Sequence, residues 1–531
     1  MSHVPIGPGP LPSPGADERR AAARGVAWSG VEAAAAALTA LLMTPLVLRT
    51  CGLEGLGLWG AAWSVAHTAG LIDLGVGSAY GRFAAQALAR GDERDLNATL
   101  AVGVGFQGAV SLVILGLAAL FGPALLDRVL PAGDRPPEAG FVLGATFLTV
   151  LLRGTLSAYR GVVAGAQRLD LLARIGTVGT IGEAALAAAL LLSGGGLRGP
   201  AIAALVGALG VTLAEAAAAH RLCPGLHIYP FRAPREQYAR VLVFGGQVQV
   251  TRAFEVLGGH APRLLLAAGP GLAAAGAYEI AARLSGFAQS AASLPLKVLI
   301  PLAGHLEVRA DTRRLKALLE RSTRYVTLLA LPVVVALLLL PETVIVAWTA
   351  RPAPPGTAAA ARLVVLAVAA LVVVSPLRLL LRASGRAGLE AAATAAGALV
   401  QIGAAAALAG RHGAPGVALA TCAGAIVALL FVAAGGRRAA TLRTGDAARA
   451  ARAPLIAGLG ALAVGIALQM LFPVAAATGR GQAIATLLTH LLLPAAVFLG
   501  LAWRGRAAGR DEIGLLFEAL RAPSRAAGRA S

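Results

Sequence analysis

Hydrophobic stretches long enough to cross a lipid bilayer recur along this chain from about residue 26 to residue 503. A hydrocarbon layer about 30 Å thick needs roughly 20 apolar residues in a helix that rises about 1.5 Å per residue. The pattern predicts an all-α polytopic membrane protein with about fourteen transmembrane helices. They are expected at 26–48, 57–80, 98–121, 139–161, 173–193, 200–219, 241–266, 273–302, 325–348, 358–378, 389–409, 415–434, 454–475 and 482–503.

Composition supports this class. Hydrophobic residues make up 57% of the chain and charged residues 14%, whereas an ordinary soluble domain has roughly 45–50% and roughly 25%. A soluble fold could not bury so much apolar surface.

The net charge of +20 suggests nucleic-acid binding until the positions of the basic residues are considered. If the N-terminus lies inside, segments on the inner side hold 33 Lys or Arg residues and the outer loops hold seven. This one-sided excess is the positive-inside pattern that orients membrane proteins. We therefore expect both termini in the cytoplasm and no nucleic-acid partner.

The two ends of the chain are expected to be cytoplasmic extensions. Residues 1–24 are rich in Pro, Gly and small residues, and the next helix is too long for the core of a signal peptide. They are predicted to form a flexible, uncleaved leader, and residues 504–531 a cytoplasmic tail. The three cysteines, Cys51, Cys223 and Cys422, suggest neither a disulfide framework nor a metal site.

The chain contains an internal repeat at a shift of 219 residues. Each repeat holds six expected helices, so the halves enter the membrane in the same direction and form two lobes related by an axis along the membrane normal. We predict an N-lobe at 25–220, a C-lobe at 221–434 and two further helices at 435–503. The shift brings Gly57, Trp59, Arg90, Asp92, Arg94 and Leu96 onto Gly276, Tyr278, Arg309, Asp311, Arg313 and Leu315.

Charged residues inside expected membrane helices are the functional candidates, because they are costly there and usually face a partner or a wet cavity. Two neighbouring helices of the second repeat are the most charged, which favours a water-filled cavity between the lobes. Pairing at i,i+3 and i,i+4 along one helix is the alternative, and Lys297 could also reach the headgroups. The residues are Arg252, Glu255, His260 and Arg263 at 241–266, and Glu279, Arg283 and Lys297 at 273–302.

Two further sets of charges lie in the first repeat. Glu32 and Asp73 fall in its first two helices and are candidate protonation sites. Arg153 and Glu183 fall near the middle of two expected helices, where a buried structural pair is favoured over a substrate site.

Motifs of common enzymes are missing from the sequence. It has no GxxxxGK[ST], HExxH, GxSxG or CxxC, so ATP-driven transport within the chain and the common hydrolytic reactions have no support. We predict a protein that is not an enzyme and has no catalytic residues, metal site or cofactor.

Segments 52–83 and 276–319 resemble the O-antigen-type lipid-linked oligosaccharide flippases of the polysaccharide transporter family, within the multidrug and oligosaccharide exporter superfamily. Such proteins are V-shaped bundles of two six-helix lobes. Many relatives carry an Asp near the outer end of the seventh helix, where this chain has His260. The residues that carry the resemblance are Leu71, Asp73, Leu74, Gly75 and Arg82 in the first segment, and Gly276, Tyr278 and Pro301 in the second.

The resemblance implies a polyprenyl-pyrophosphate-linked glycan as substrate, moved from the inner to the outer leaflet of the bacterial cytoplasmic membrane for synthesis of lipopolysaccharide or exopolysaccharide. Arg engages phosphate oxygens through parallel hydrogen bonds, so Arg252 and Arg283 are expected to bind the pyrophosphate. Lys297 and Arg82 are expected to receive the headgroup at the cytoplasmic opening.

The acidic residues Glu255, Glu279, Asp73 and Glu32 are expected to balance the cations or to couple transport to H⁺ or Na⁺. His67 or His260 could also carry a coupling proton, although a lone histidine in a membrane helix is more often a hydrogen-bonded packing residue. Expected partners are the lipid-linked glycan, membrane lipids and a glycan polymerase or glycosyltransferases.

Two other functions remain open from the sequence. An ion-coupled multidrug exporter of the same superfamily would share the repeat and the topology, although cationic drugs call for an acidic and aromatic lining. A non-transporting membrane scaffold for glycan assembly would use the basic loops to bind anionic lipids and partners.

Overall fold

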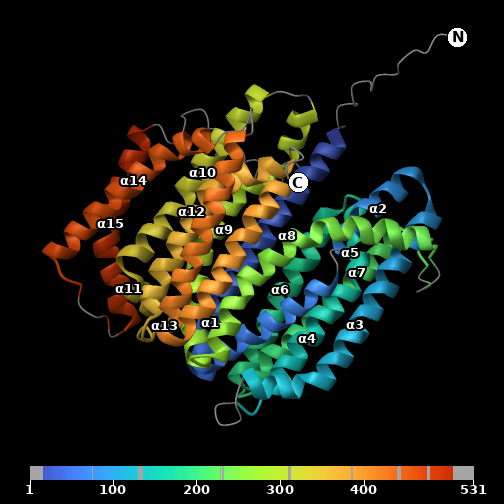
Figure 1. Cartoon of the computed structure of the whole chain (residues 1–531), viewed down its shortest axis with the longest axis horizontal. Helices are drawn as coiled ribbons and strands as arrows, with labels where there is room; N and C mark the ends of the chain where they lie inside the picture. Colours follow the sequence, from blue (N-terminus) through green and yellow to red (C-terminus); the bar gives the residue numbers. More distant parts are fainter. Residues whose placement is uncertain are drawn as a thin grey trace, which may run out of the picture.

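The computed structural model describes residues 16–73, 76–129, 136–227, 229, 233–308, 312–383, 387–438, 444–474, 477 and 479–505. Within these ranges every regular element is helical, with fifteen α-helices and one short 3-10 helix (Figure 1). The predicted all-α fold class is confirmed.

The first half of the chain opens with a helical hairpin. Gly52 has a φ of 74° inside α1, a value that glycine adopts without steric cost, and the helix reverses there. Residues 16–51 and 53–69 are called the first and second arms of α1. The elements are α1 (Ala16–Ala69), η1 (Gly70–Asp73), α2 (Val76–Arg90), α3 (Glu93–Val129), α4 (Ala139–Thr155), α5 (Ser157–Gly165), α6 (Leu169–Leu192) and α7 (Arg198–Leu222).

The second half of the chain contains a similar break at a glycine with positive φ, since Gly413 has a φ of 55° inside α13. The helix expected at 325–348 is divided in two. Pro341 starts the second piece, where the missing N–H of proline is tolerated. The elements are α8 (Arg235–Ala268), α9 (Leu272–Val308), α10 (Thr312–Leu339), α11 (Pro341–Thr349), α12 (Thr357–Ala383), α13 (Ala387–Arg438), α14 (Thr444–Leu471) and α15 (Arg480–Arg504).

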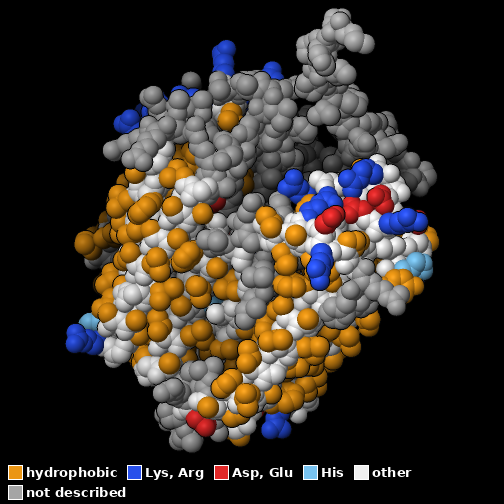
Figure 2. Space-filling model, turned by 45° about the vertical axis from the view of Figure 1, so that its right-hand side comes forward, with side chains coloured by type: hydrophobic (Ala, Val, Ile, Leu, Met, Phe, Trp, Pro, Cys, Tyr) orange, Lys and Arg blue, Asp and Glu red, His pale blue; other side chains and the backbone are white. Residues whose placement is uncertain are grey.

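Ten helices in the described part of the chain are long and apolar enough to cross a membrane. Two of these, with 43 and 48 residues, contain the reversals at Gly52 and Gly413. The long helices α8 and α9 fall outside this set. The exact number of fourteen is therefore not confirmed, but the multi-span architecture is. Figure 2 shows hydrophobic side chains over much of one face, with charged side chains gathered toward one end.

The helices form two groups joined by α1 and α8. Helices α2 to α7 pack among themselves, as do α9 to α15, while α1 packs on both α6 and α9, and α8 packs on α13 and α1 (Figure 1). The residue limits assigned from the sequence to the leader, the lobes and the tail stay predictions. We keep the names N-lobe for helices α1 to α7 and C-lobe for helices α8 to α15.

The two lobes touch through a reciprocal contact of backbones. A Cβ atom added to Gly57 would overlap the carbonyl oxygen of Leu272, and one added to Gly276 would overlap the carbonyl oxygen of Leu53. Gly57 and Gly276, like Leu53 and Leu272, are 219 residues apart, which is the shift of the repeat. A two-fold axis produces this reciprocity, and small residues allow such close crossings.

Further hydrogen bonds join the lobes near the same end. Trp348 Nε1 donates to the carbonyl oxygen of Leu41 at 2.7 Å, and Arg351 Nη2 donates to that of Arg49 at 3.3 Å. The first arm of α1 is thus tied to α11 and the loop that follows it. The end of the molecule that carries Gly52, called the Gly52 end, is closed in this structure.

Candidate functional site

A cavity of about 470 Å³ lies among α1, α4, α5, α6, α7 and α9. Most of its wall belongs to the N-lobe, and α9 contributes one side chain from the C-lobe. Three arginines and three glutamates line it: Arg153, Arg160, Arg283, Glu32, Glu183 and Glu215.

Two ion pairs hold N-lobe arginines in place. Arg153 Nη2 donates to Glu183 Oε2 at 3.0 Å, and Arg160 Nη1 donates to Glu215 Oε1 at 2.7 Å. The Arg153 and Arg160 side chains are 45% and 49% exposed, whereas that of Glu215 is 4% exposed. A guanidinium has five N–H donors, so each arginine keeps further donors for the cavity.

The local sequence explains why the two arginines share a wall. Arg153, Ser157 and Arg160 follow one another at i, i+4 and i+7, which places them on one helical face. The helix is interrupted at Leu156, between α4 and α5, and Ser157 Oγ donates to the Gly154 carbonyl oxygen there at 2.7 Å. The resulting polar row faces the cavity.

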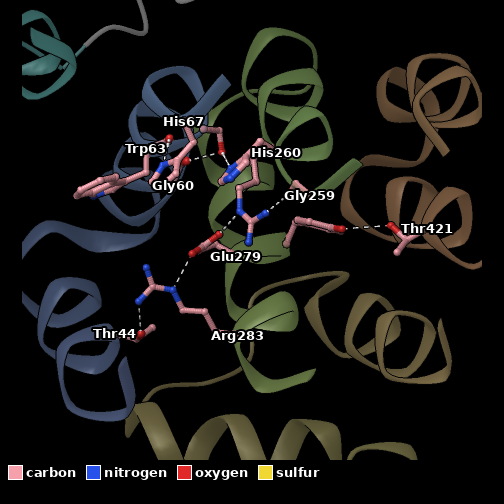
Figure 3. Close-up of polar contacts among 12 residues, drawn as sticks. Thr44, Gly60, Trp63, His67, Gly259, His260, Glu279, Arg283 and Thr421 are labelled. Carbon is pink, nitrogen blue, oxygen red and sulfur yellow. Dashed lines mark hydrogen bonds and ion pairs between the residues drawn. The ribbon is translucent and has the colours of Figure 1, made fainter. Parts of the chain in front are cut away.

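Arg283 reaches the cavity from the C-lobe. Its Nη1 donates to Thr44 Oγ1 on the first arm of α1 at 2.6 Å, and its Nε donates to Glu279 Oε1 at 2.6 Å (Figure 3). Glu279 is buried and accepts a second bond, from Arg263 Nε, at 2.5 Å. One carboxylate therefore joins α8 to α9, and Arg283 joins both to the N-lobe.

Replacing Glu279 by alanine is expected to destabilise the protein strongly. Removing one partner from a buried ionic group costs about 3–5 kcal/mol, and here both Arg263 and Arg283 lose their carboxylate. Thermal unfolding in detergent would measure the effect. The matched control is Glu342→Ala, because Glu342 pairs with Arg362 at 3.1 Å but is 54% exposed, and such pairs contribute less than about 1 kcal/mol. Equal shifts of the midpoint in both variants would contradict the expectation.

Aromatic rings follow one another along the second arm of α1. Trp59, Trp63 and His67 are four residues apart, with ring centroids separated by 5.8 Å and 5.2 Å. His67 stacks on His260 of α8 at 5.0 Å, and His260 Nδ1 lies 3.2 Å from Ser64 Oγ (Figure 3). The two tryptophans line the cavity.

The residues predicted from the sequence are divided between several places. Arg283 and Glu32 line the cavity, and Glu279 is bonded to Arg283. Arg252 and Glu255 on α8 and Arg82 on α2 are exposed and are not among the described lining residues. Asp73 lies in η1 and Lys297 in α9, but their side chains are outside the described residues. The roles assigned to all of these residues stay predictions.

Among the charged and aromatic side chains that line the cavity, four were not predicted from the sequence. Arg160 and Glu215 lie near the ends of expected helices, where the positive-inside pattern already accounts for an arginine, and Trp59 and Trp63 look like ordinary packing residues. The predicted Arg153–Glu183 pair is present, but it also lines the cavity. The seven-residue spacing of Arg153 and Arg160 was the available signal.

Among the described residues, no group of three or more His, Cys, Asp or Glu side chains could hold a metal ion. The chemistry that this cavity offers is the binding of polar and charged groups.

Comparison with solved structures shows the fold. The lipid II flippase MurJ in an inward closed conformation superposes with a TM-score of 0.70, at 14% identity, over 91% of this chain and 99% of that one. An inward-facing MATE family multidrug transporter of the MOP superfamily gives 0.61 at 14% identity, over 77% and 98%. A Vibrio cholerae MATE transporter gives 0.55 at 15% identity, over 79% and 98%. These neighbours are a flippase and transporters rather than enzymes.

A search of curated proteins finds no match to this sequence. The sequence profile of a family described as "Polysaccharide biosynthesis protein" matches residues 22–307, which is more than half of the chain. The chain belongs to the polysaccharide biosynthesis protein family.

Proposed function

We propose that this protein is a flippase that moves a polyprenyl-pyrophosphate-linked oligosaccharide from the inner to the outer leaflet of the bacterial cytoplasmic membrane. The observation that carries the proposal is the convergence of Arg153, Arg160 and Arg283, from both lobes, on one cavity. A pyrophosphate carries several anionic oxygens, and the planar guanidinium fork matches such groups better than a lysine does.

The glutamates do not argue against an anionic ligand. An unpaired arginine within the membrane is costly, so a carboxylate paired with each guanidinium stabilises the protein before a headgroup binds. Glu215 is nearly buried, while Arg160 is half exposed. A headgroup entering the cavity therefore meets the arginine first, in an orientation that the carboxylate has already fixed.

Binding of the headgroup to Arg283 would weaken contacts between the two lobes. Arg283 holds Thr44 of α1 and Glu279 of α9 at the same time, so phosphate oxygens that bind Arg283 compete with both contacts. Alternating access then consists of opening the Gly52 end as the lobes rock around the cavity. We assign the Gly52 end to the outer side and both termini to the cytoplasm.

Coupling and partners are further parts of this proposal. Glu32 lines the cavity and is our candidate for uptake of a coupling H⁺ or Na⁺. Glycosyltransferases would supply the lipid-linked glycan on the inner side, and a polymerase would use it on the outer side, for lipopolysaccharide or exopolysaccharide.

An ion-coupled multidrug exporter is the second candidate. Two observations favour it: the fold is similar to MATE transporters, and the cavity contains three glutamates and two tryptophans, which suit organic cations. Because two of these glutamates, Glu183 and Glu215, are bonded to arginines, we rank it second.

Binding measurements on the purified protein in lipid nanodiscs test the proposal. We expect a short-chain polyprenyl pyrophosphate bearing a sugar to bind at micromolar concentration or below, and a cationic amphiphilic dye neither to bind nor to displace it. The same lipid with a neutral alcohol headgroup is the matched control. Binding of the dye but not the pyrophosphate would favour the exporter, and binding of neither would favour the scaffold.

A further inference from the structure

The cavity contains an aromatic surface that the binding of phosphate leaves unexplained. Phe, Trp and Tyr together make up 5% of the chain, and it has only five tryptophans. Two of these, Trp59 and Trp63, line the same cavity as the arginines. Resting on the proposed function, we infer that Trp59 and Trp63 form a sugar-stacking face that receives the pyranose attached to the pyrophosphate.

The partial exposure of the two rings distinguishes them from a tryptophan of the core. Their planes meet at 82° with centroids 5.8 Å apart, so the pair offers the face of one indole beside the edge of the other. Both are only partly buried. Trp348 is the contrast within the chain, because it is 7% exposed and its Nε1 donates to a carbonyl oxygen.

A pyranose ring is chemically matched to this surface. Its axial C–H groups carry partial positive charge and form an apolar face, and the face of an indole carries partial negative charge. In the described part of the chain, the indole N–H groups of Trp59 and Trp63 donate to no protein acceptor. Both therefore remain available for sugar hydroxyls or phosphate oxygens.

Hydroxyl groups in the same cavity complete the site. Thr39, Ser157 and Thr180 line the cavity together with the arginines and glutamates. Stacking on a ring while polar groups at the rim bind the hydroxyls satisfies both faces of a sugar. The volume of about 470 Å³ falls within the range of roughly 300–1,000 Å³ that is usual for small-molecule sites, so the cavity suits the sugar nearest the pyrophosphate rather than a long glycan.

Two lipids and a set of variants in nanodiscs test this inference. The lipids are a short-chain polyprenyl pyrophosphate and the same lipid bearing one hexose. We expect the wild type to bind the hexose-bearing lipid at least tenfold more tightly. Trp59→Leu and Trp63→Leu should lose this preference and keep the affinity for the sugar-free lipid, and Trp63→Phe should retain part of the preference. Trp503→Leu, at an exposed position on α15, is the matched control and should behave as the wild type.

The outcomes separate this inference from the function on which it rests. Equal binding of both lipids by the wild type would overturn the sugar-stacking face while supporting a pyrophosphate site. The sugar-stacking face would also be overturned if Trp63→Leu lost affinity for both lipids equally while its thermal midpoint matched that of Trp503→Leu. Failure of both lipids to bind the wild type would instead overturn the proposed function.

Discussion

Transport is expected to fall to background when valine replaces Gly57. The Cα of Gly57 lies against the Leu272 carbonyl oxygen with no room for a side chain, so a valine forces the second arm of α1 away from α9. The Gly52 end can then no longer close, and a protein that works by alternating access needs both closed and open states. Gly276→Val is expected to have the same effect, because the two glycines make the reciprocal contact.

Cross-linking across the Gly52 end measures this effect directly. Cysteines replace Leu53 and Leu272 in a chain whose three native cysteines are changed to serine, and a short bifunctional thiol reagent is applied. We expect efficient cross-linking with Gly57 present and little with valine in its place. Gly116→Val is the matched control, because a Cβ at Gly116 meets no neighbouring atom within 4 Å. Unchanged cross-linking and transport in Gly57→Val would show that the contact is not a gate.

Binding of the pyrophosphate lipid is expected to weaken strongly when a cavity arginine is removed together with the carboxylate that pairs with it. Glu215→Gln alone keeps Arg160 and should retain binding of the pyrophosphate lipid. The double variant Arg160→Gln with Glu215→Gln removes the ion pair as a unit and should weaken binding. A hydrogen bond to a charged group contributes about 1.5–3 kcal/mol, which corresponds to roughly ten- to a hundredfold in affinity. Adding Arg283→Gln should weaken it further.

The comparison of these variants distinguishes ligand binding from stability. If Arg160 matters only through its ion pair, Glu215→Gln should harm the protein as much as the double variant does. Binding isotherms and thermal midpoints measured on the same preparations would reveal this. An affinity that falls equally in Glu215→Gln and the double variant would contradict a direct contact between Arg160 and the headgroup.

The membrane architecture and the repeat could be predicted from the sequence because both depend on patterns along the chain. The length of the apolar stretches predicts the helices, and the shift of 219 residues predicts the symmetry that Gly57 and Gly276 display in the structure. The division of expected helices was not predicted. At Pro341 the cause is visible in the sequence, whereas at Leu156 the interruption between α4 and α5 has no Pro or positive φ to mark it.

The candidate site was predicted less completely because its contacts come from different helices. The i,i+4 pair of Glu279 with Arg283 follows from spacing and is present at 2.6 Å. The bond from Arg263 to the same carboxylate joins α8 to α9 and requires the packing of the two helices to be known. Arg160 resembles an arginine at the membrane surface until the fold places it opposite Glu215.

Native mass spectrometry of the protein, gently purified from its own membranes, tests the central proposal most directly. The wild type is expected to carry a polyprenyl pyrophosphate glycan, Glu215→Gln to carry it as well, and the variant combining Arg160→Gln, Glu215→Gln and Arg283→Gln to lose it. Only bulk phospholipids on the wild type, or the same glycan lipid on all three proteins, would contradict an arginine-lined site for the lipid-linked headgroup.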